Sequence, residues 1–210
     1  LAAQYYEYPS KNINMIGVTG TNGKTTVTHL LQKIFEASGE KCGIIGTLGY
    51  KFKSTDDYAE AKHTTPQAPE FQHLLKKAAD EGIKTIAAEV SSHSLEQNRV
   101  GGTIWNTAVL TNLTQDHLDY HITMNNYFEA KAILFRGLKD GDFAVINKDD
   151  EYAERFISVV PNGVKVVTYG VKKEADYSAK DISFSMHGAK YTLTCDGKEY
   201  PVNLQLNGMF

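Results

Sequence analysis

The chain has few of the residues and runs that mark several common protein classes. It holds 2 cysteines in 210 residues, and Cys42 and Cys195 are too few and too scattered for a disulfide framework or a cysteine-based metal site. No apolar run approaches the ~20 residues of a membrane-spanning helix. Residues 1–6 lack the basic and then apolar layout of a signal peptide. We therefore expect a cytoplasmic protein with no membrane partner.

An excess of charge of one sign is also missing. The formal net charge is −3, and 41% hydrophobic with 22% charged residues is ordinary for a globular protein. Without a global basic surface, nothing argues for a nucleic-acid partner. The length suits one large domain or one domain with an appendage. The sequence shows no internal repeats, and we expect a monomer.

The most informative segment that is present runs from Val18 to Thr26. The apolar run before it, residues 13–18, is typical of a buried strand, and the apolar spacing after it, residues 27–35, predicts a helix with one apolar face. A glycine-bearing turn between such a strand and helix lets backbone N–H groups surround phosphate oxygens. We expect Lys24 to reach the terminal phosphates and the Thr25 hydroxyl to bind Mg²⁺. The chain is therefore predicted to bind a nucleoside triphosphate.

This phosphate loop departs from the common pattern G-x-x-x-x-G-K-[ST] at one position. The pattern has glycine where this chain has Val18, and the glycine comes two residues later, at Gly20. A short pattern can match by chance, but a strand before it and a helix after it are the context that it requires. The loop residues predicted to contact the nucleotide are Gly20, Thr21, Asn22, Gly23, Lys24, Thr25 and Thr26.

The order of patterns along the chain predicts an α/β fold. From about residue 13 to 170, apolar runs alternate with helical periodicities, which indicates a mostly parallel sheet flanked by helices. From about residue 181 to 206 the apolar period is two, with turns at 187–188 and 196–197, which indicates a small antiparallel meander. Further elements of the parallel part are expected at 67–80 (helix) and at 83–90, 107–110, 143–147 and 164–169 (strands).

Two side chains stand out within these elements. In open α/β sheets ligands bind beyond the carboxyl ends of the strands, and Glu89 ends an apolar run there, where a carboxylate can hold Mg²⁺ or simply be solvated. Lys131 occupies a position where the helical period requires an apolar residue. It either extends to the surface or lies half-buried with a lowered pKa or a charge partner, which usually indicates function. The apolar residues of its helix face are Met124, Tyr127, Phe128, Leu134, Phe135 and Leu138.

Three further polar clusters are candidates. In residues 116–121, His117 and His121 are spaced to share a helix face, so a polar loop, a zinc site or a hard-cation site near the phosphates are all open, and the last is favoured because no third soft ligand stands out. Residues 63–66 begin the second helix, where hydroxyls and free N–H groups suit an N-cap or an anionic substrate. Residues 91–93 hold a Ser–His pair, but the nucleophile elbow of a hydrolase is absent.

Together these segments resemble the Mur ligases, which are ATP-dependent, amide-bond-forming enzymes of peptidoglycan synthesis. The matching segments, in the same order and spacing, are residues 17–26, 64–66, 89–93, 111–121 and 129–131. Members of the family have a UDP-sugar domain, a central ATPase domain and a C-terminal domain. The resemblance implies the exit of the first domain at 1–10, the central domain at 11–207, and the start of the hinge to the third at 208–210.

The resemblance also implies roles for the candidate residues. The catalytic set would be Lys24, Glu89, His117 and Lys131. Thr25 with Glu89 would bind a first Mg²⁺, and His117 with Lys131 a second, with Lys131 carboxylated on its side-chain nitrogen. Asn112 would contact ATP beside the phosphate loop. The residues implied to bind the muramoyl-dipeptide are Thr64, Thr65, Ser91, Gln97 and Arg99.

Within the family, the closest likeness is to members that add a diamino acid, meso-diaminopimelate or L-lysine, to UDP-N-acetylmuramoyl-L-alanyl-D-glutamate through an acyl phosphate. The central domain by itself is expected to turn nothing over. One alternative is a sibling with the same core, such as folylpolyglutamate synthetase or the MurT-type subunit, although MurT would carry a four-cysteine zinc ribbon. Another is a nucleotide-binding module without ligase activity, and residues 147–150, Asn-Lys-Asp-Asp, look like the guanine motif of a GTPase.

Overall fold

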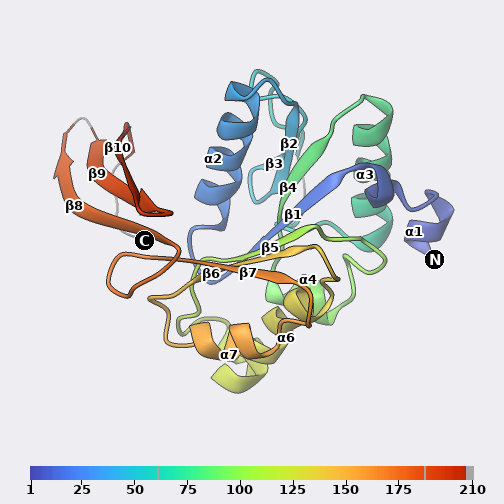
Figure 1. The fold of residues 1–210 in the computed structure, drawn as a ribbon. Coiled ribbons are helices and arrows are strands. Elements are labelled where there is room, and N and C mark those ends of the chain that lie inside the picture. The colour runs from blue at the N-terminus through green and yellow to red at the C-terminus, as the bar shows by residue number, and fades with distance from the viewer. Residues whose placement is uncertain (61, 187, 207–210) are drawn as a thin grey trace.

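One large sheet organises the molecule (Figure 1). The computed structural model describes residues 1–60, 62–186 and 188–206, and within them ten strands join in the order β10-β9-β8-β7-β6-β5-β1-β4-β2-β3. The strands from β7 to β2 pair in parallel. Their bounds are β1 (Asn14–Thr19), β2 (Cys42–Gly46), β4 (Thr85–Glu89), β5 (Thr107–Leu110), β6 (Phe143–Asn147) and β7 (Lys165–Gly170).

The C-terminal strands are antiparallel, as the period of two predicts, and they extend the main sheet. They are β8 (Tyr177–Ser185), β9 (Gly188–Cys195) and β10 (Lys198–Leu204). β8 joins β7 through only two parallel pairs, Tyr169 with Tyr177 and Gly170 with Ser178. The predicted meander therefore begins four residues earlier than expected, and the predicted α/β fold class is confirmed. His187 of the expected turn, and residues 207–210, lie outside the described residues.

Helices flank the sheet. The long ones are α2 (Lys24–Ala37), α3 (Ala68–Asp80) and α6 (Met124–Arg136). The short ones are α1 (Ala2–Tyr5), η1 (Pro9–Asn12), α4 (Ser92–Glu96), α5 (Leu118–His121) and α7 (Ala153–Ser158). In Figure 1, α2 lies on one side of strands β5 to β7, and α6 and α7 lie on the other. Within the described residues, no helix is both long enough and apolar enough to span a lipid bilayer.

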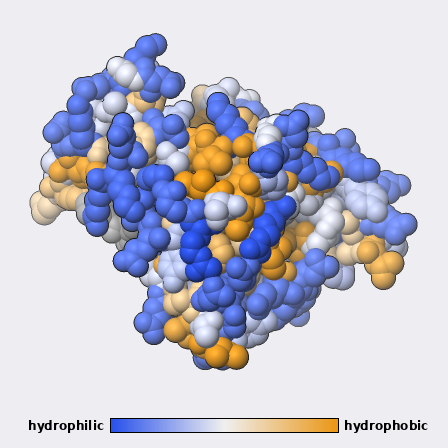
Figure 2. Space-filling view, turned by 60° about the horizontal axis from the view of Figure 1, so that its bottom comes forward, coloured by the Kyte–Doolittle hydropathy of each residue, from blue (hydrophilic) through white to orange (hydrophobic). Residues whose placement is uncertain are grey.

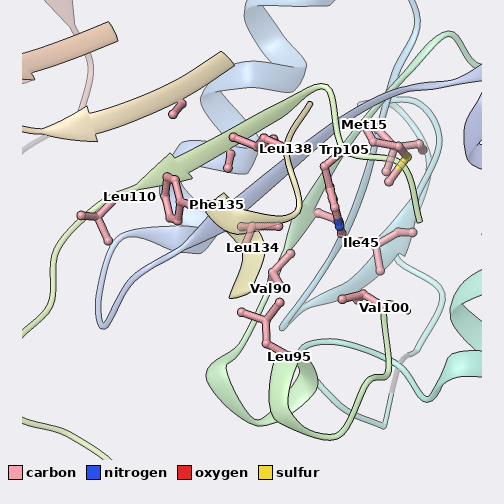
Figure 3. Packing of buried hydrophobic residues seen from close by; sticks show 14 of the residues in the cluster. Met15, Ile45, Val90, Leu95, Val100, Trp105, Leu110, Leu134, Phe135 and Leu138 are labelled. Atoms are coloured by element: carbon pink, nitrogen blue, oxygen red, sulfur yellow. The ribbon is translucent and has the colours of Figure 1, made fainter. Parts of the chain in front are cut away.

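Alternation along β1 divides the core between the two faces of the sheet. Met15 belongs to a large cluster that includes side chains of α3 and α6 and the buried Trp105 (Figure 3). Ile16 and Val18 face the other way and form a small cluster with Val109, against which α2 packs. Successive strand residues point to opposite faces, so a single strand supplies both cores. On the face shown in Figure 2, hydrophobic residues gather near the middle among hydrophilic ones.

The apolar face predicted for α2 is only partly correct. Val27, Leu31 and Phe35 are half-buried against the small cluster, but Ile34 is 63% exposed. The fully buried positions of the helix are Thr28 and Gln32. Polar residues can be buried here because both find partners: the Thr28 hydroxyl donates to the carbonyl of Thr25, and the Gln32 amide donates to the carbonyl of Cys42.

Strands β2 and β3 (Gly49–Lys51) are absent from the predicted elements. Strands β5 and β6 have the predicted bounds, and α3 begins one residue after the predicted start. The β2 segment reads Cys-Gly-Ile-Ile-Gly, which has no alternation and two glycines. Gly43 lets the two strands pack closely, because a Cβ there would lie 2.6 Å from the side chain of Ile86 on β4. Close packing of two buried strands therefore removes the pattern by which a strand is predicted.

Candidate active site

Four functional segments meet at the carboxyl ends of adjacent strands. The phosphate loop follows β1, Glu89 ends β4, Thr47 follows β2, and Thr111 follows β5. The sheet order β5-β1-β4-β2 makes these strand ends neighbours, and the register pairs Val18 with Glu89. This edge is where parallel α/β sheets bind ligands.

The phosphate loop takes a shape that only glycine permits at two positions. Gly20 has a φ of 147° and Gly23 a φ of 85°, and Gly23 is the N-cap of α2. A Cβ at Gly20 would lie 1.9 Å from the Thr111 hydroxyl oxygen. Glycine is required here, two residues after the common position, because the loop backbone presses against the segment that follows β5.

That segment after β5 holds the loop in place. The N–H of Thr21 donates to the Asn112 carbonyl at 2.9 Å, and the N–H of Asn22 donates to the Asn112 side-chain oxygen at 3.0 Å. The Thr111 hydroxyl donates to the Asn22 carbonyl at 2.6 Å. These bonds leave the first N–H groups of α2, which have no partner within a helix, as donors for an anion. The role of Asn112 toward the nucleotide itself stays a prediction.

Two lysines converge on one carbonyl oxygen of the loop. Lys24 Nζ lies 3.0 Å from the Gly20 oxygen and 2.9 Å from the Thr21 oxygen, and Lys131 Nζ lies 2.9 Å from the same Gly20 oxygen. Burial lowers the pKa of Lys24, while the nearby charges of Glu89 and Asp116 oppose that shift. The charge of Lys24 disfavours a second positive charge on Lys131, so an anion between the two lysines would be favoured.

Lys131 does not extend to the surface. Its side chain is 1% exposed, and Nζ lies 4.5 Å from the ring centre of Tyr127, one turn earlier on α6. Burial, and secondarily the charge of Lys24, hold the pKa of Lys131 well below its usual value. The alternative in which Lys131 extends to the surface is therefore wrong, and the side chain is buried more deeply than the half-buried placement that the sequence suggests.

Glu89 is a buried carboxylate, and among the described residues its side chain receives hydrogen bonds from Thr47. It is 1% exposed and accepts from the backbone N–H of Thr47 at 3.1 Å and from the Thr47 hydroxyl at 3.0 Å. The negative charge of Glu89 acts to raise the pKa of Lys24, against the larger effect of burial. The solvated strand end, the alternative for Glu89, is therefore wrong, because tertiary packing encloses the end of β4.

His117 and His121 do not share a helix face as their spacing predicts. His117 precedes α5 with a φ of 50° and is the N-cap of that helix. Its side chain is 49% exposed beside Asp116, whereas His121 is buried, with Nε2 2.8 Å from the Ser92 hydroxyl. In the described part of the chain, no three His, Cys, Asp or Glu side chains are placed to hold one metal ion. The zinc alternative therefore has no ligand set.

The five residues expected at the substrate lie side by side. The Thr65 hydroxyl donates to the Glu89 carbonyl at 2.8 Å and accepts from the Ser91 N–H at 3.1 Å. Arg99 donates to the Thr65 carbonyl at 3.2 Å and to the Gln97 side-chain oxygen at 2.6 Å. Thr64 precedes Thr65 in the chain, and its hydroxyl oxygen lies 3.1 Å from that of Thr47. Their contact with a substrate stays a prediction.

The Asn-Lys-Asp-Asp segment has a structural role that competes with guanine recognition. Asp150 accepts from the backbone N–H of Leu113 at 2.7 Å and of Tyr152 at 2.8 Å. Asp149 accepts from the N–H groups of residues 171–173. Both carboxylates are therefore engaged by backbone, which leaves the GTPase alternative without a free carboxylate in this segment.

Sequence patterns miss three residues of the site. Thr47 was not predicted because it follows a strand that was not predicted. Thr111 and Asp150 were not predicted because their hydrogen bonds join different loops. Beside the phosphate loop, α2 and the C-terminal strands enclose a mainly apolar groove of about 510 Å³, whose lining includes Thr26, Leu30, Asn112, Asn147, Phe184 and Leu204.

Known protein families and relatives match nearly the whole length of this chain. The family described as "Mur ligase middle domain" matches residues 18–210. A protein of Synechococcus elongatus named UDP-N-acetylmuramoyl-L-alanyl-D-glutamate–2,6-diaminopimelate ligase is 43% identical over the whole chain, which covers 42% of it. A protein of Bacillus cereus with the same name is 40% identical, with 43% of its length covered. The chain thus spans less than half the length of these relatives.

A solved structure supports the same grouping. The structure of a UDP-N-acetylmuramoyl-L-alanyl-D-glutamate–2,6-diaminopimelate ligase superposes with a TM-score of 0.86 at 34% identity, covering 98% of this chain and 43% of that one. The likeness therefore includes the antiparallel strands as well as the parallel part of the sheet.

Proposed function

The chain belongs to the Mur ligase family, and from that premise we propose that it is the ATP-binding middle domain of a MurE-like ligase. The ligase would add a diamino acid, 2,6-diaminopimelate in the named relatives, to UDP-N-acetylmuramoyl-L-alanyl-D-glutamate. The observation that carries the proposal is the convergence of Lys24 and Lys131 on the Gly20 carbonyl, next to the free N–H groups of α2. Relatives at about 40% identity favour this ligase over the sibling enzymes.

ATP fits the edge of the sheet in one orientation. The N–H groups at the start of α2 and Lys24 would hold the β- and γ-phosphates. The groove lined by Thr26 and Asn112 would then receive the nucleoside, because it adjoins the loop on the side of the C-terminal strands. Mainly apolar walls with a few polar groups suit a purine base.

Thr25 and Glu89 fit a magnesium ion. A hydroxyl and a carboxylate are the hard oxygen ligands that Mg²⁺ prefers, and within the part of the chain that the structure describes each oxygen of Glu89 accepts one hydrogen bond, from Thr47. The metal would offset the negative charge of the triphosphate and the attacking carboxylate. The chain's part is to hold Glu89 buried and aimed along the edge where the phosphates bind.

Lys131 fits a second magnesium only after a chemical change. An ammonium group repels a cation, but a buried amine with a lowered pKa can add CO₂, which forms an N–C bond, gives a carbamate and releases a proton. The carbamate would replace a positive charge with a negative one beside Lys24. We propose this carboxylated Lys131, together with His117, as the second site.

The substrate would lie between α4 and the magnesium ion proposed at Thr25 and Glu89. Thr64, Thr65, Ser91, Gln97 and Arg99 would bind the muramoyl-dipeptide, and a guanidinium such as that of Arg99 suits a carboxylate. The D-glutamate γ-carboxylate would attack the γ-phosphate of ATP, forming an acyl phosphate and releasing ADP. The amine of the diamino acid would then displace phosphate. Lys24 would act by position and charge, as in other phosphoryl transfers.

The domain limits remain as the sequence suggests them. We propose residues 1–10 as the exit of a UDP-binding domain, 11–207 as the middle domain and 208–210 as the start of a hinge. The greater length of the relatives supports this division. A monomer in the cytoplasm is the state in which we expect the ligase to act.

The test is phosphate release by the full-length ligase with ATP, Mg²⁺, the UDP-muramoyl-dipeptide and a panel of amino acids. We expect release to require both the dipeptide and one diamino acid. Lys24→Ala should abolish it, because the phosphates lose their charged ligand, whereas Lys33→Ala should not, since that side chain on the same helix is 69% exposed. Release that is indifferent to the dipeptide, or full activity of Lys24→Ala, would refute the proposal.

A further inference from the structure

The end of β2 forms a cradle for the Glu89 carboxylate. Thr47 supplies two donors, its N–H to one carboxylate oxygen at 3.1 Å and its hydroxyl to the other at 3.0 Å. Gly46 supplies the space, because a Cβ there would lie 2.2 Å from a Glu89 oxygen. Two adjacent residues therefore fix the carboxylate, one by hydrogen bonds and the other by having no side chain.

The Thr47 hydroxyl also contacts Thr64, with the two oxygens 3.1 Å apart. A hydroxyl has one proton to donate and two lone pairs to accept. The Thr47 hydroxyl is placed to donate both to the Thr64 hydroxyl oxygen and to Glu89, so its single proton is shared between these two acceptors. The Thr47 hydroxyl therefore links Thr64 to Glu89.

We propose that Thr47 is a positioning residue that orients Glu89 for its cation and joins it to the dipeptide side of the site through Thr64. The inference rests on the proposed function, in which Glu89 binds Mg²⁺ and Thr64 binds the dipeptide. Thr47 occupies one lone pair of each Glu89 oxygen and leaves the others for the cation. Partners of this kind, which hold a ligand rather than the metal, commonly set metal affinity.

The experiment compares Thr47→Val and Thr47→Ser in the full-length ligase. Valine keeps the shape and the N–H but removes the hydroxyl, and serine keeps the hydroxyl. Isothermal titration with ADP, with and without Mg²⁺, measures binding apart from turnover. We expect Thr47→Val to raise the Mg²⁺ concentration needed for half-maximal ADP binding by about tenfold, with Mg²⁺-free ADP binding unchanged, and Thr47→Ser to restore the wild-type value.

Two further variants separate positioning from general damage. Gly46→Ala should raise the Mg²⁺ requirement in the same direction, because its methyl group displaces the carboxylate. In a Glu89→Gln background, Thr47→Val should add little, since the carboxylate that it orients is gone. Thermal denaturation checks that each variant is folded, and Gly46→Ala carries the test if Thr47→Val is not.

The outcomes distinguish this inference from the function on which it rests. If wild-type ADP binding ignores Mg²⁺, or if Glu89→Gln leaves its Mg²⁺ dependence intact, the metal site itself is refuted. If Glu89→Gln loses the dependence while Thr47→Val keeps it, only the role of Thr47 is refuted. Equal impairment of Thr47→Ser and Thr47→Val would also overturn it, because the hydroxyl would then not be the group that matters.

Discussion

Lys131 lies on the buried face of α6, with its amine against the phosphate loop. Its Nζ is within 2.9 Å of the Gly20 carbonyl, and its pKa is held well below the usual value first by burial and then by Lys24. Placing a charge there is costly, because desolvation disfavours the ammonium form. A residue kept at such a position is better explained by the chemistry of its neutral amine than by packing.

At this scale we predict that Lys131→Ala is inactive and can be rescued. Removing the anion that a carboxylated lysine would supply should lower phosphate release by about 100-fold or more, and added short carboxylates such as acetate should restore part of it. Lys139→Ala, an exposed lysine just beyond the same helix, is the matched control. Carboxylates that leave the Lys131→Ala rate unchanged would contradict the carbamate.

At the scale of elements, the turn after β6 supports the phosphate loop from a distance. Asp150 is 9% exposed and holds the N–H of Leu113. The preceding residue, Asn112, bonds the backbone of Asn22 in the loop. Asn147 adds a bond to the carbonyl of Thr111 at 2.8 Å. The end of β6 therefore holds the segment after β5 by hydrogen bonds, and that segment holds the phosphate loop.

We predict that Asp150→Ala, at a position that also lines the groove proposed for the nucleoside, weakens both the fold and nucleotide binding. The buried N–H of Leu113 would lose its partner, which costs about 1–3 kcal/mol of unfolding free energy, measured by urea denaturation. ADP affinity in calorimetry should fall with it because the phosphate loop loosens. Glu151→Ala, the exposed neighbour, should change neither quantity. If the Asp150→Ala protein is destabilised but binds ADP as tightly as the wild type, Asp150 does not support the phosphate loop.

At the scale of the molecule, the residues that we propose to bind the nucleotide lie close together. The phosphate loop and Glu89 lie at the carboxyl ends of the adjacent strands β1 and β4, and Lys131 reaches the loop from α6. The relatives are more than twice as long as the stretch that they share with this chain. A reaction that joins two substrates and excludes water needs groups on both sides of them.

We therefore predict that residues 1–210, produced alone, bind ADP with Mg²⁺ but release no phosphate in response to the dipeptide and a diamino acid. Binding follows from the loop, and turnover is absent because the rest of the ligase is missing. Calorimetry measures the first and a phosphate assay the second, with the full-length ligase as the control. Turnover that depends on the dipeptide in the 1–210 chain would show that the middle domain suffices.

Features that depend on neighbours along the chain could be predicted from the residues alone. Strands β5 and β6, helix α3 and the phosphate loop follow from local periodicity and turn chemistry. The phase of Lys131 places it on the apolar face of α6, since a helix turns the same face inward over its whole length, but the phase leaves open whether the side chain stays buried or extends to the surface.

The way in which the strand ends meet depends on the order of the strands in the sheet, which local sequence patterns do not reveal. Thr47 and Glu89 are 42 residues apart, and they touch because β2 lies beside β4 in the sheet order. Periodicity reveals which face of a strand is buried but not which strand is its neighbour. For the same reason, the requirement for glycine at Gly20 was visible only with Thr111 in place. His117 is itself the left-handed N-cap of α5, so it does not lie on the helix face that carries His121.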